Sequence, residues 1–118
     1  MAKILVVDDA AFMRMRCTRL LLDNGYETIE AGNGVEALQK YRQHKPDGVL
    51  LDITMPDMDG IETLKKLVEI DPGVKVSMVT AMGQQSLVVE ALKSGARDFV
   101  VKPFNADRVL AAVKKITG

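Results

Sequence analysis

The stretch Gly48-Val-Leu-Leu-Asp-Ile-Thr-Met-Pro-Asp-Met-Asp-Gly60 sets an aspartate, Asp52, directly at the end of a short apolar run. Continuous apolar runs of this length are typical of strands that are buried on both faces of a parallel sheet. Pro56 and the acidic residues beside it break the pattern, which indicates a loop. The stretch therefore predicts a buried strand over residues 48–52 that ends on a carboxylate.

Apolar periodicity predicts the same unit, a strand and then a helix, along the whole chain. The expected strands span residues 3–8, 26–31, 48–52, 74–80 and 98–102. The expected helices span residues 11–24, 33 to about 44, 61 to about 71, about 84 to 93, and 105–116. This alternation predicts a single α/β domain over residues 1–118, a doubly wound parallel sheet with helices on both faces. With the common strand order 2-1-3-4-5, the ligand site lies outside the carboxyl ends of the strands.

Composition narrows the classes of function. The 16 lysines and arginines balance the 16 aspartates and glutamates, which argues against nucleic acid as a direct partner. No apolar run approaches the roughly 20 residues of a membrane helix, and no secretory signal is visible. The single cysteine, Cys17, has no partner for an internal disulfide, and its place on an apolar helix face predicts a packed, inert thiol. We therefore expect a cytoplasmic protein that does not enter a membrane.

Polar residues stand at the ends of four predicted strands. Asp8 and Asp9 follow the first strand, Asp52 ends the third, Thr80 the fourth and Lys102 the fifth. Because parallel strands share a direction, these ends meet at one edge of the sheet. Clustered carboxylates repel one another unless a cation joins them, and Mg²⁺ prefers a few carboxylates with waters and phosphate oxygens. The pattern predicts a Mg²⁺ and phosphoryl site, with Asp52 as the nucleophile and with Lys102 and Thr80 stabilising phosphoryl oxygens.

Each of these residues also has a purely structural interpretation. Asp9 is placed to cap the helix that begins near residue 11, and Thr80 and Asp52 are common residue types at turns. Lys102 fits an ordinary solvated lysine at a strand end. For each residue taken alone, the structural interpretation is the more common one. If all of them held, complementary polar groups would stand at successive strand ends by coincidence. We therefore favour a shared site.

The chain resembles the receiver domain of two-component response regulators over essentially its whole length. The resemblance is carried by Ile4-Leu-Val-Val-Asp-Asp9, Leu51-Asp-Ile-Thr-Met-Pro-Asp-Met-Asp-Gly60, Thr80-Ala81 and Val101-Lys-Pro-Phe104. Within that family, the chain is most similar to single-domain chemotaxis receivers. The resemblance implies a flavodoxin-like fold without a fused output domain. It also implies a phosphorylation-activated switch that catalyses its own phosphorylation and dephosphorylation.

The resemblance also assigns roles at the acidic edge. Asp52 would accept a phosphoryl group from a histidine kinase, and Lys102 would contact that group. Asp9 and Asp52 would bind Mg²⁺ directly, together with the backbone carbonyl of Thr54, whereas Asp8 would act largely through a water.

For the switch, the resemblance implies that Thr80 swings toward the phosphoryl group while Phe99 turns inward to fill the vacated space. Phe99 lacks the hydroxyl of the tyrosine found in the enteric chemotaxis protein. The family also has a cis peptide bond before the residue that matches Pro103. In the family, the residues at the positions of Thr54 and Met82 tune how fast the aspartyl phosphate is hydrolysed. Neither residue is acidic or carries an amide, so the resemblance implies no particular lifetime for the phosphoryl group in this chain.

The partners implied are a CheA-like histidine kinase and the flagellar motor switch protein FliM. FliM would dock on the face formed by the fourth helix, fifth strand and fifth helix. Ala10-Ala-Phe-Met-Arg14 and Ala81-Met-Gly-Gln-Gln85 are similar to receivers outside the enteric group, which implies a phosphatase of the CheC, CheX or FliY type. We expect the receiver to act as a monomer.

Other functions remain open on the same residues. One is a relay that passes its phosphoryl group to a histidine phosphotransfer protein, and another is a Mg²⁺-dependent phosphohydrolase that uses Asp52. A flavin carrier is disfavoured because the acidic loop after the first strand would repel a flavin phosphate. His44, near a helix end, is interpreted as solvated and not as a phosphodonor. The similarity of Asp57-Met-Asp59-Gly60 to aspartate-nucleophile phosphatases is interpreted as coincidence.

Overall fold

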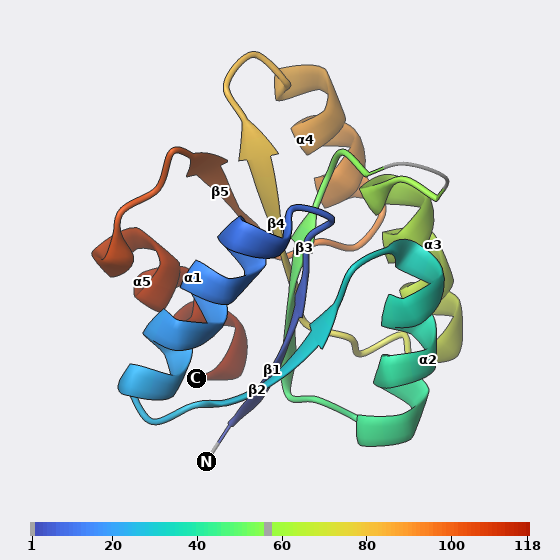
Figure 1. The fold of residues 1–118 in the computed structure, drawn as a ribbon. Coiled ribbons are helices and arrows are strands. Elements are labelled where there is room, and N and C mark those ends of the chain that lie inside the picture. The colour runs from blue at the N-terminus through green and yellow to red at the C-terminus, as the bar shows by residue number, and fades with distance from the viewer. Residues whose placement is uncertain (1, 56–57) are drawn as a thin grey trace.

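In the computed structural model, which describes residues 2–55 and 58–118, five parallel strands form one sheet in the order β2-β1-β3-β4-β5 (Figure 1). The strands are β1 (Lys3–Val7), β2 (Glu27–Ala31), β3 (Gly48–Asp52), β4 (Val76–Ala81) and β5 (Asp98–Lys102). The helices are α1 (Ala11–Asp23), α2 (Gly34–His44), α3 (Gly60–Ile70), α4 (Gln85–Lys93) and α5 (Ala106–Thr117). The predicted doubly wound α/β fold and its strand order are confirmed. None of the described helices has the length and apolar character needed to cross a membrane.

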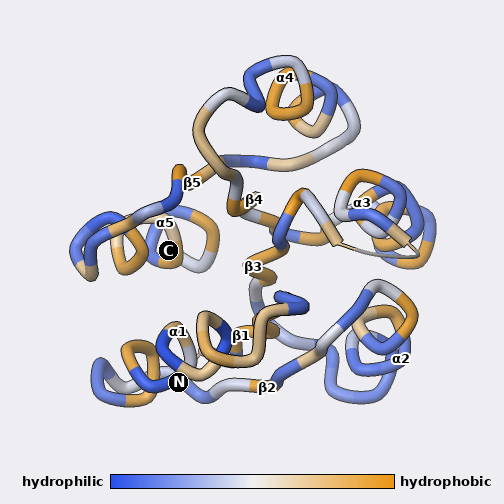
Figure 2. Tube along the Cα trace, turned by 45° about the horizontal axis from the view of Figure 1, so that its top comes forward, coloured by the Kyte–Doolittle hydropathy of each residue, from blue (hydrophilic) through white to orange (hydrophobic). Residues whose placement is uncertain are grey.

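The helices cover the sheet in two separate layers (Figure 2). α1 and α5 pack on one face, and α2, α3 and α4 pack on the other. Alternate residues of β1 point to opposite faces of the sheet: Ile4 packs with α1 and α5, and Leu5 packs with the helices on the other face. Every residue of β3 is buried. The strand that carries Asp52 is therefore enclosed on both faces.

Several element boundaries differ from the sequence prediction by one or two residues. β4 begins at Val76 and not at residue 74, because the Val74 N–H donates to the Asp71 carbonyl in a turn and the ladder with β3 starts where Val76 pairs with Val49. Val74 is nevertheless buried, which is why its apolar character extended the predicted strand. β1 ends at Val7, one residue before the predicted end.

Side-chain caps define the starts of three helices. Asn33 accepts a hydrogen bond from the Glu36 N–H and Asn105 accepts one from the Arg108 N–H, as expected for caps of α2 and α5. Asp59 caps α3 in the same way, at 2.8 Å from the Glu62 nitrogen. The interpretation of the Asp57–Gly60 similarity as coincidence left Asp59 without a role, and the structure supplies one.

Gly60 is required by a close approach between the start of α3 and the end of β3. A Cβ atom at Gly60 would lie 2.1 Å from the Asp52 carbonyl oxygen and 2.6 Å from the Ile53 Cα. The Gly60 N–H also donates to the Ile53 carbonyl at 2.7 Å. The helix therefore packs directly on the backbone that carries Asp52.

We expect Gly60→Ala to lower the free energy of unfolding by about 2–3 kcal/mol, because the backbone of Asp52 and Ile53 would have to move away from the new methyl group. The matched control is Gly73→Ala, whose Cβ would meet only the Asp71 Oδ1 atom, at 3.4 Å. The control should change stability by less than about 0.5 kcal/mol. Urea unfolding of both variants measures the difference, and equal effects would contradict the close-approach explanation.

Candidate functional site

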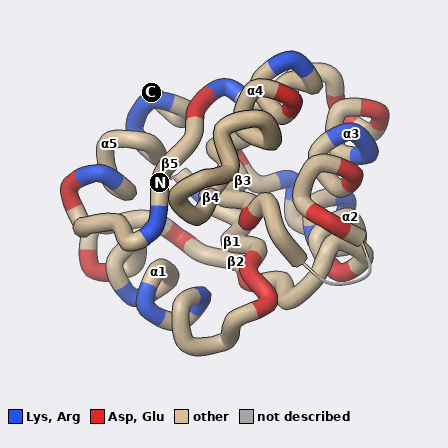
Figure 3. The backbone as a smooth tube through the Cα atoms, turned by 90° about the horizontal axis from the view of Figure 1, so that it is seen from above, with Lys and Arg blue, Asp and Glu red and all other residues tan. Residues whose placement is uncertain are grey.

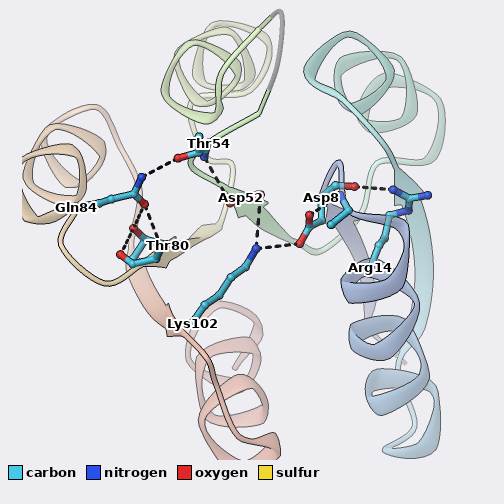
Figure 4. A network of polar contacts seen from close by, with 9 residues as sticks. Asp8, Arg14, Asp52, Thr54, Thr80, Gln84 and Lys102 are labelled. Atoms are coloured by element: carbon cyan, nitrogen blue, oxygen red, sulfur yellow. Dashed lines mark hydrogen bonds and ion pairs between the residues drawn. The ribbon is translucent and has the colours of Figure 1, made fainter.

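The predicted polar residues lie at the carboxyl edge of the sheet, close around the end of β3 (Figure 4). Lys102 reaches across from β5, with its Nζ 3.3 Å from Asp8 Oδ2 and 3.6 Å from Asp52 Oδ2. Viewed from above, acidic segments gather beside β1 and β3 near the centre of the molecule (Figure 3). The strand ends thus bring together groups that are far apart in the sequence.

Asp8 is buried, and two groups besides Lys102 hold it in place. Its Oδ1 accepts a hydrogen bond from the Ala10 N–H at 2.9 Å, and its backbone carbonyl accepts one from the Arg14 guanidinium. Arg14 is anchored in turn by Glu30 at the end of β2, at 3.1 Å. The residue before α1 is Ala10, which makes no side-chain cap, so the interpretation of Asp9 as a helix cap is wrong. Nothing in the sequence pattern had indicated the role of Arg14.

Three carboxylates form a group suited to a hard cation. Asp8, Asp9 and Asp52 each offer one oxygen, and these oxygens lie within 4.8 Å of one another. Asp8 and Asp52 are buried, whereas Asp9 is exposed to solvent. A donor set of oxygens with one open side matches the preference of Mg²⁺ for a few carboxylates completed by water and phosphate oxygens. The residues present therefore fit the predicted metal.

The environment of Asp52 opposes its ionisation. The pKa of Asp52 is raised from 3.8 to about 6, mainly by burial. The Lys102 ammonium lowers this pKa, and the Asp8 and Asp9 carboxylates raise it. The Thr54 N–H, 3.4 Å from Asp52 Oδ1, also lowers this pKa. A second positive charge at the site would favour the carboxylate form.

Thr80 lies at the same edge but is turned toward another partner. Its side chain is buried, and its Oγ1 donates to Gln84 Oε1 at 2.7 Å. Gln84 in turn donates from Nε2 to Thr54 Oγ1 at 2.8 Å. Among the hydrogen bonds of the described residues, none joins Thr80 to Asp52. Sequence reasoning placed Thr80 correctly at the edge and missed Gln84 altogether.

Phe99 borders an apolar hollow between β5 and α4. The hollow has a volume of about 480 Å³ and is lined by Thr80, Met82, Val88 and Phe99, among others. Phe99 is half-buried and packs against the edge of the core cluster on the α2, α3 and α4 side of the sheet. The two residues assigned to the switch therefore line one cavity.

The remaining expectations concern residues outside the acidic cluster. The bond between Lys102 and Pro103 is cis, as expected. Cys17 is packed, and burial raises the pKa of its thiol to about 11, which agrees with an inert side chain. His44 is exposed in the last turn of α2. Pro56 and Asp57 lie outside the described residues.

Comparison with known proteins gives one consistent family. The family model described as the response regulator receiver domain matches residues 4–114. The chemotaxis protein CheY of Bacillus subtilis is 55% identical over 114 residues, which cover 96% of this chain and 95% of that protein. The sporulation initiation phosphotransferase F of Bacillus subtilis is 41% identical over 113 residues, covering 96% of this chain and 91% of that protein.

Among solved structures, the receiver domain of NtrX from Brucella abortus superposes with a TM-score of 0.94 at 34% identity and covers 97% of both chains. A protein with a different name therefore has the same backbone fold, and the fold by itself does not show which function a receiver has. Together with the acidic edge around Asp52, the match over residues 4–114 shows that the chain belongs to the response regulator receiver domain family.

Proposed function

We propose that this receiver is switched on when Asp52 accepts a phosphoryl group from a histidine kinase. The observation that supports the proposal best is the position of Asp52, buried at the end of β3 with the Lys102 ammonium 3.6 Å away and two further carboxylates beside it. An aspartate with a purely structural role would gain nothing from this buried, acidic environment, which raises its pKa and lowers the stability of the folded protein.

The proposed reaction transfers the phosphoryl group without any other reactant. One carboxylate oxygen of Asp52 attacks the phosphorus of a phosphohistidine, the P–N bond breaks, and the histidine nitrogen leaves with the electron pair and takes up a proton. In the dephosphorylation that ends the signal, a water oxygen attacks the phosphorus and the P–O bond to Asp52 breaks. This step releases inorganic phosphate and restores the carboxylate.

The other residues at the edge have supporting roles in this proposal. Asp9, Asp52 and the backbone carbonyl of Thr54 would hold Mg²⁺, with Asp8 acting largely through a water. When bound, the metal supplies positive charge that offsets the negative charge of the phosphoryl oxygens. Lys102 already lies between Asp8 and Asp52, where its ammonium can contact the same oxygens.

The signal would be read through the switch pair Thr80 and Phe99. Both residues line the hollow beside α4, so a movement of Thr80 toward Asp52 would open space for the Phe99 ring. This change would alter the surface formed by α4, β5 and α5. Residues 1–118 would act as one monomeric receiver domain in the cytoplasm and pass the signal to a separate protein.

The output that we propose is control of flagellar rotation in chemotaxis. It is supported by the 55% identity with the chemotaxis protein CheY of Bacillus subtilis. The partners would then be a CheA-like kinase, the motor switch protein FliM and a phosphatase of the CheC, CheX or FliY type. A phosphorelay intermediate is the second candidate, favoured by the 41% identity with the sporulation initiation phosphotransferase F.

We expect one labile phosphoryl group per chain when the protein is incubated with acetyl phosphate and Mg²⁺, as read by intact mass. Asp52→Asn should gain none, and removal of the metal with a chelator should prevent labelling of the unmodified protein. Asp98→Asn is the matched control, because the Asp98 side chain is 11% exposed against 10% for Asp52 and is also paired with cations.

Equal labelling of the Asp52→Asn variant would refute the proposed acceptor. Sustained turnover of a small phosphate ester would favour the phosphohydrolase instead. Transfer from the labelled protein to a histidine phosphotransfer domain would favour the relay.

We expect Asp52→Asn to stabilise the metal-free protein by about 1–3 kcal/mol near pH 7. The folded pKa of Asp52, about 6, lies above its ordinary value of 3.8, so folding favours the protonated form. The stability contributed by Asp52 is therefore present below about pH 4 and is lost as the pH rises through about 6.

The gain from the substitution should accordingly shrink as the pH falls and vanish near pH 4. Urea unfolding of the two proteins between about pH 4 and pH 7 measures this difference in the free energy of unfolding. A gain that does not depend on pH would show that Asp52 is not the titrating group. Mg²⁺ should stabilise the unmodified protein more than the variant, because only the former keeps all three carboxylates.

Phosphorylation should tighten binding of a FliM N-terminal peptide by about tenfold, measured by fluorescence anisotropy. Val101→Asp should weaken that binding without affecting labelling, because Val101 is exposed on β5 beside the hollow. Val35→Asp, at an exposed position on α2, is the control and should bind normally. If binding of the peptide does not tighten after phosphorylation, the motor role is wrong while the acceptor proposal stands.

A further inference from the structure

The Gln84 side chain joins two loops at the edge of the acidic site (Figure 4). Gln84 immediately precedes α4, yet its side chain does not cap that helix. Its Oε1 instead accepts from Thr80 Oγ1 at 2.7 Å and from the Ala81 N–H at 3.0 Å. Its Nε2 donates to Thr54 Oγ1 at 2.8 Å. One amide therefore ties the loop after β4 to the loop after β3.

The bond to Gln84 uses the only proton that the Thr80 hydroxyl can donate. The other acceptor near that hydroxyl is the Ala81 carbonyl, at 3.1 Å, and both acceptors lie on the side of the loop after β4. Thr80 is 1% exposed, so no bulk water competes for the proton. Thr80 can donate to a phosphoryl group on Asp52 only after it gives up Gln84.

The Nε2 half of the amide contacts the loop beside Asp52, at Thr54. Thr54 follows Asp52 by two residues, and its N–H approaches Asp52 Oδ1 at 3.4 Å. Since the Gln84 side chain is bonded to the Thr54 hydroxyl, a movement of the Gln84 amide would also move the loop beside Asp52. The same side chain thus contacts both the residue that moves and the loop beside the residue that is modified.

We propose that Gln84 is a positioning residue that keeps Thr80 in the inactive arrangement and thereby sets how readily the receiver switches. This inference rests on the proposed function, because it assumes that Thr80 turns toward a phosphoryl group on Asp52. Gln84 stabilises only the arrangement in which Thr80 is turned away, so its loss shifts the equilibrium toward the active arrangement.

The first experiment concerns the unphosphorylated protein and does not depend on the proposed function. Gln84→Leu removes the acceptor at similar size, Gln84→Glu keeps an acceptor for Thr80 and Ala81, and Gln85→Leu changes an exposed neighbour outside the network. In NMR spectra, Gln84→Leu should shift the Ala81 amide proton and let the Thr80 side chain populate more than one rotamer. Gln84→Glu and Gln85→Leu should retain the single Thr80 rotamer. A single, unchanged rotamer in Gln84→Leu would overturn the inference.

The second experiment measures the switching equilibrium. Beryllofluoride, a phosphoryl mimic that binds carboxylates, is titrated in the presence of Mg²⁺ and followed by NMR. Gln84→Leu should bind it about fivefold more tightly, the effect of one hydrogen bond that no longer has to be broken. Gln85→Leu should bind it like the unmodified protein. Unchanged or weaker binding by a folded Gln84→Leu variant would overturn the inference.

The two proposals fail in different ways. If the unmodified protein neither binds the mimic nor is labelled by acetyl phosphate, the acceptor proposal fails, and the rotamer measurement still decides whether Gln84 holds Thr80. If it is labelled normally and Gln84→Leu changes neither the Thr80 rotamer nor the affinity, only the role of Gln84 is refuted. A slower loss of phosphate in Gln84→Leu with an unchanged rotamer would assign Gln84 to the attacking water, contrary to our proposal.

Discussion

The site depends on the parallel pairing of β3 with its two neighbours. Leu51 pairs with Val7 of β1 and Asp52 with Val79 of β4, so the last residue of the buried strand emerges beside the start of the acidic loop. The packing of Gly60 against the Asp52 carbonyl fixes the same backbone from the other side. Because both faces of β3 are covered by helices, the Asp52 side chain has one direction open to it, toward the edge where Asp8 and Lys102 lie.

This enclosure lowers the stability of the metal-free protein. The sheet buries Asp52 and Asp8 close together, and burial is the largest reason for the raised pKa of Asp52. Lys102 compensates only in part, since a single ammonium faces two buried carboxylates at 3.3 and 3.6 Å. The metal-free protein therefore gives up stability at this edge, and a cation bound by the three carboxylates would recover part of it.

Polar contacts around Asp52 connect this edge to the rest of the molecule. Arg14 links the Asp8 backbone to β2, and Gln84 links Thr54 to Thr80. The Arg14 and Gln84 side chains come from the first turn of α1 and the loop before α4, where small movements need not disturb the core. The apolar hollow lined by Thr80 and Phe99 lies next to this edge.

The sequence by itself determined the alternation of strands and helices and the gathering of acids at the strand ends. Those features follow from local periodicity and from the shared direction of parallel strands. The tertiary structure decided the contact between Gln84 and Thr54 and the role of Arg14. The cap at Asp59 joins residues three apart, so it is a local feature that the sequence analysis missed. Gln84 and Thr54 are 30 residues apart, and Lys102 and Asp8 are 94 apart. No local pattern records whether such side chains meet, because the packing of the loops sets which hydrogen-bond donor reaches which acceptor.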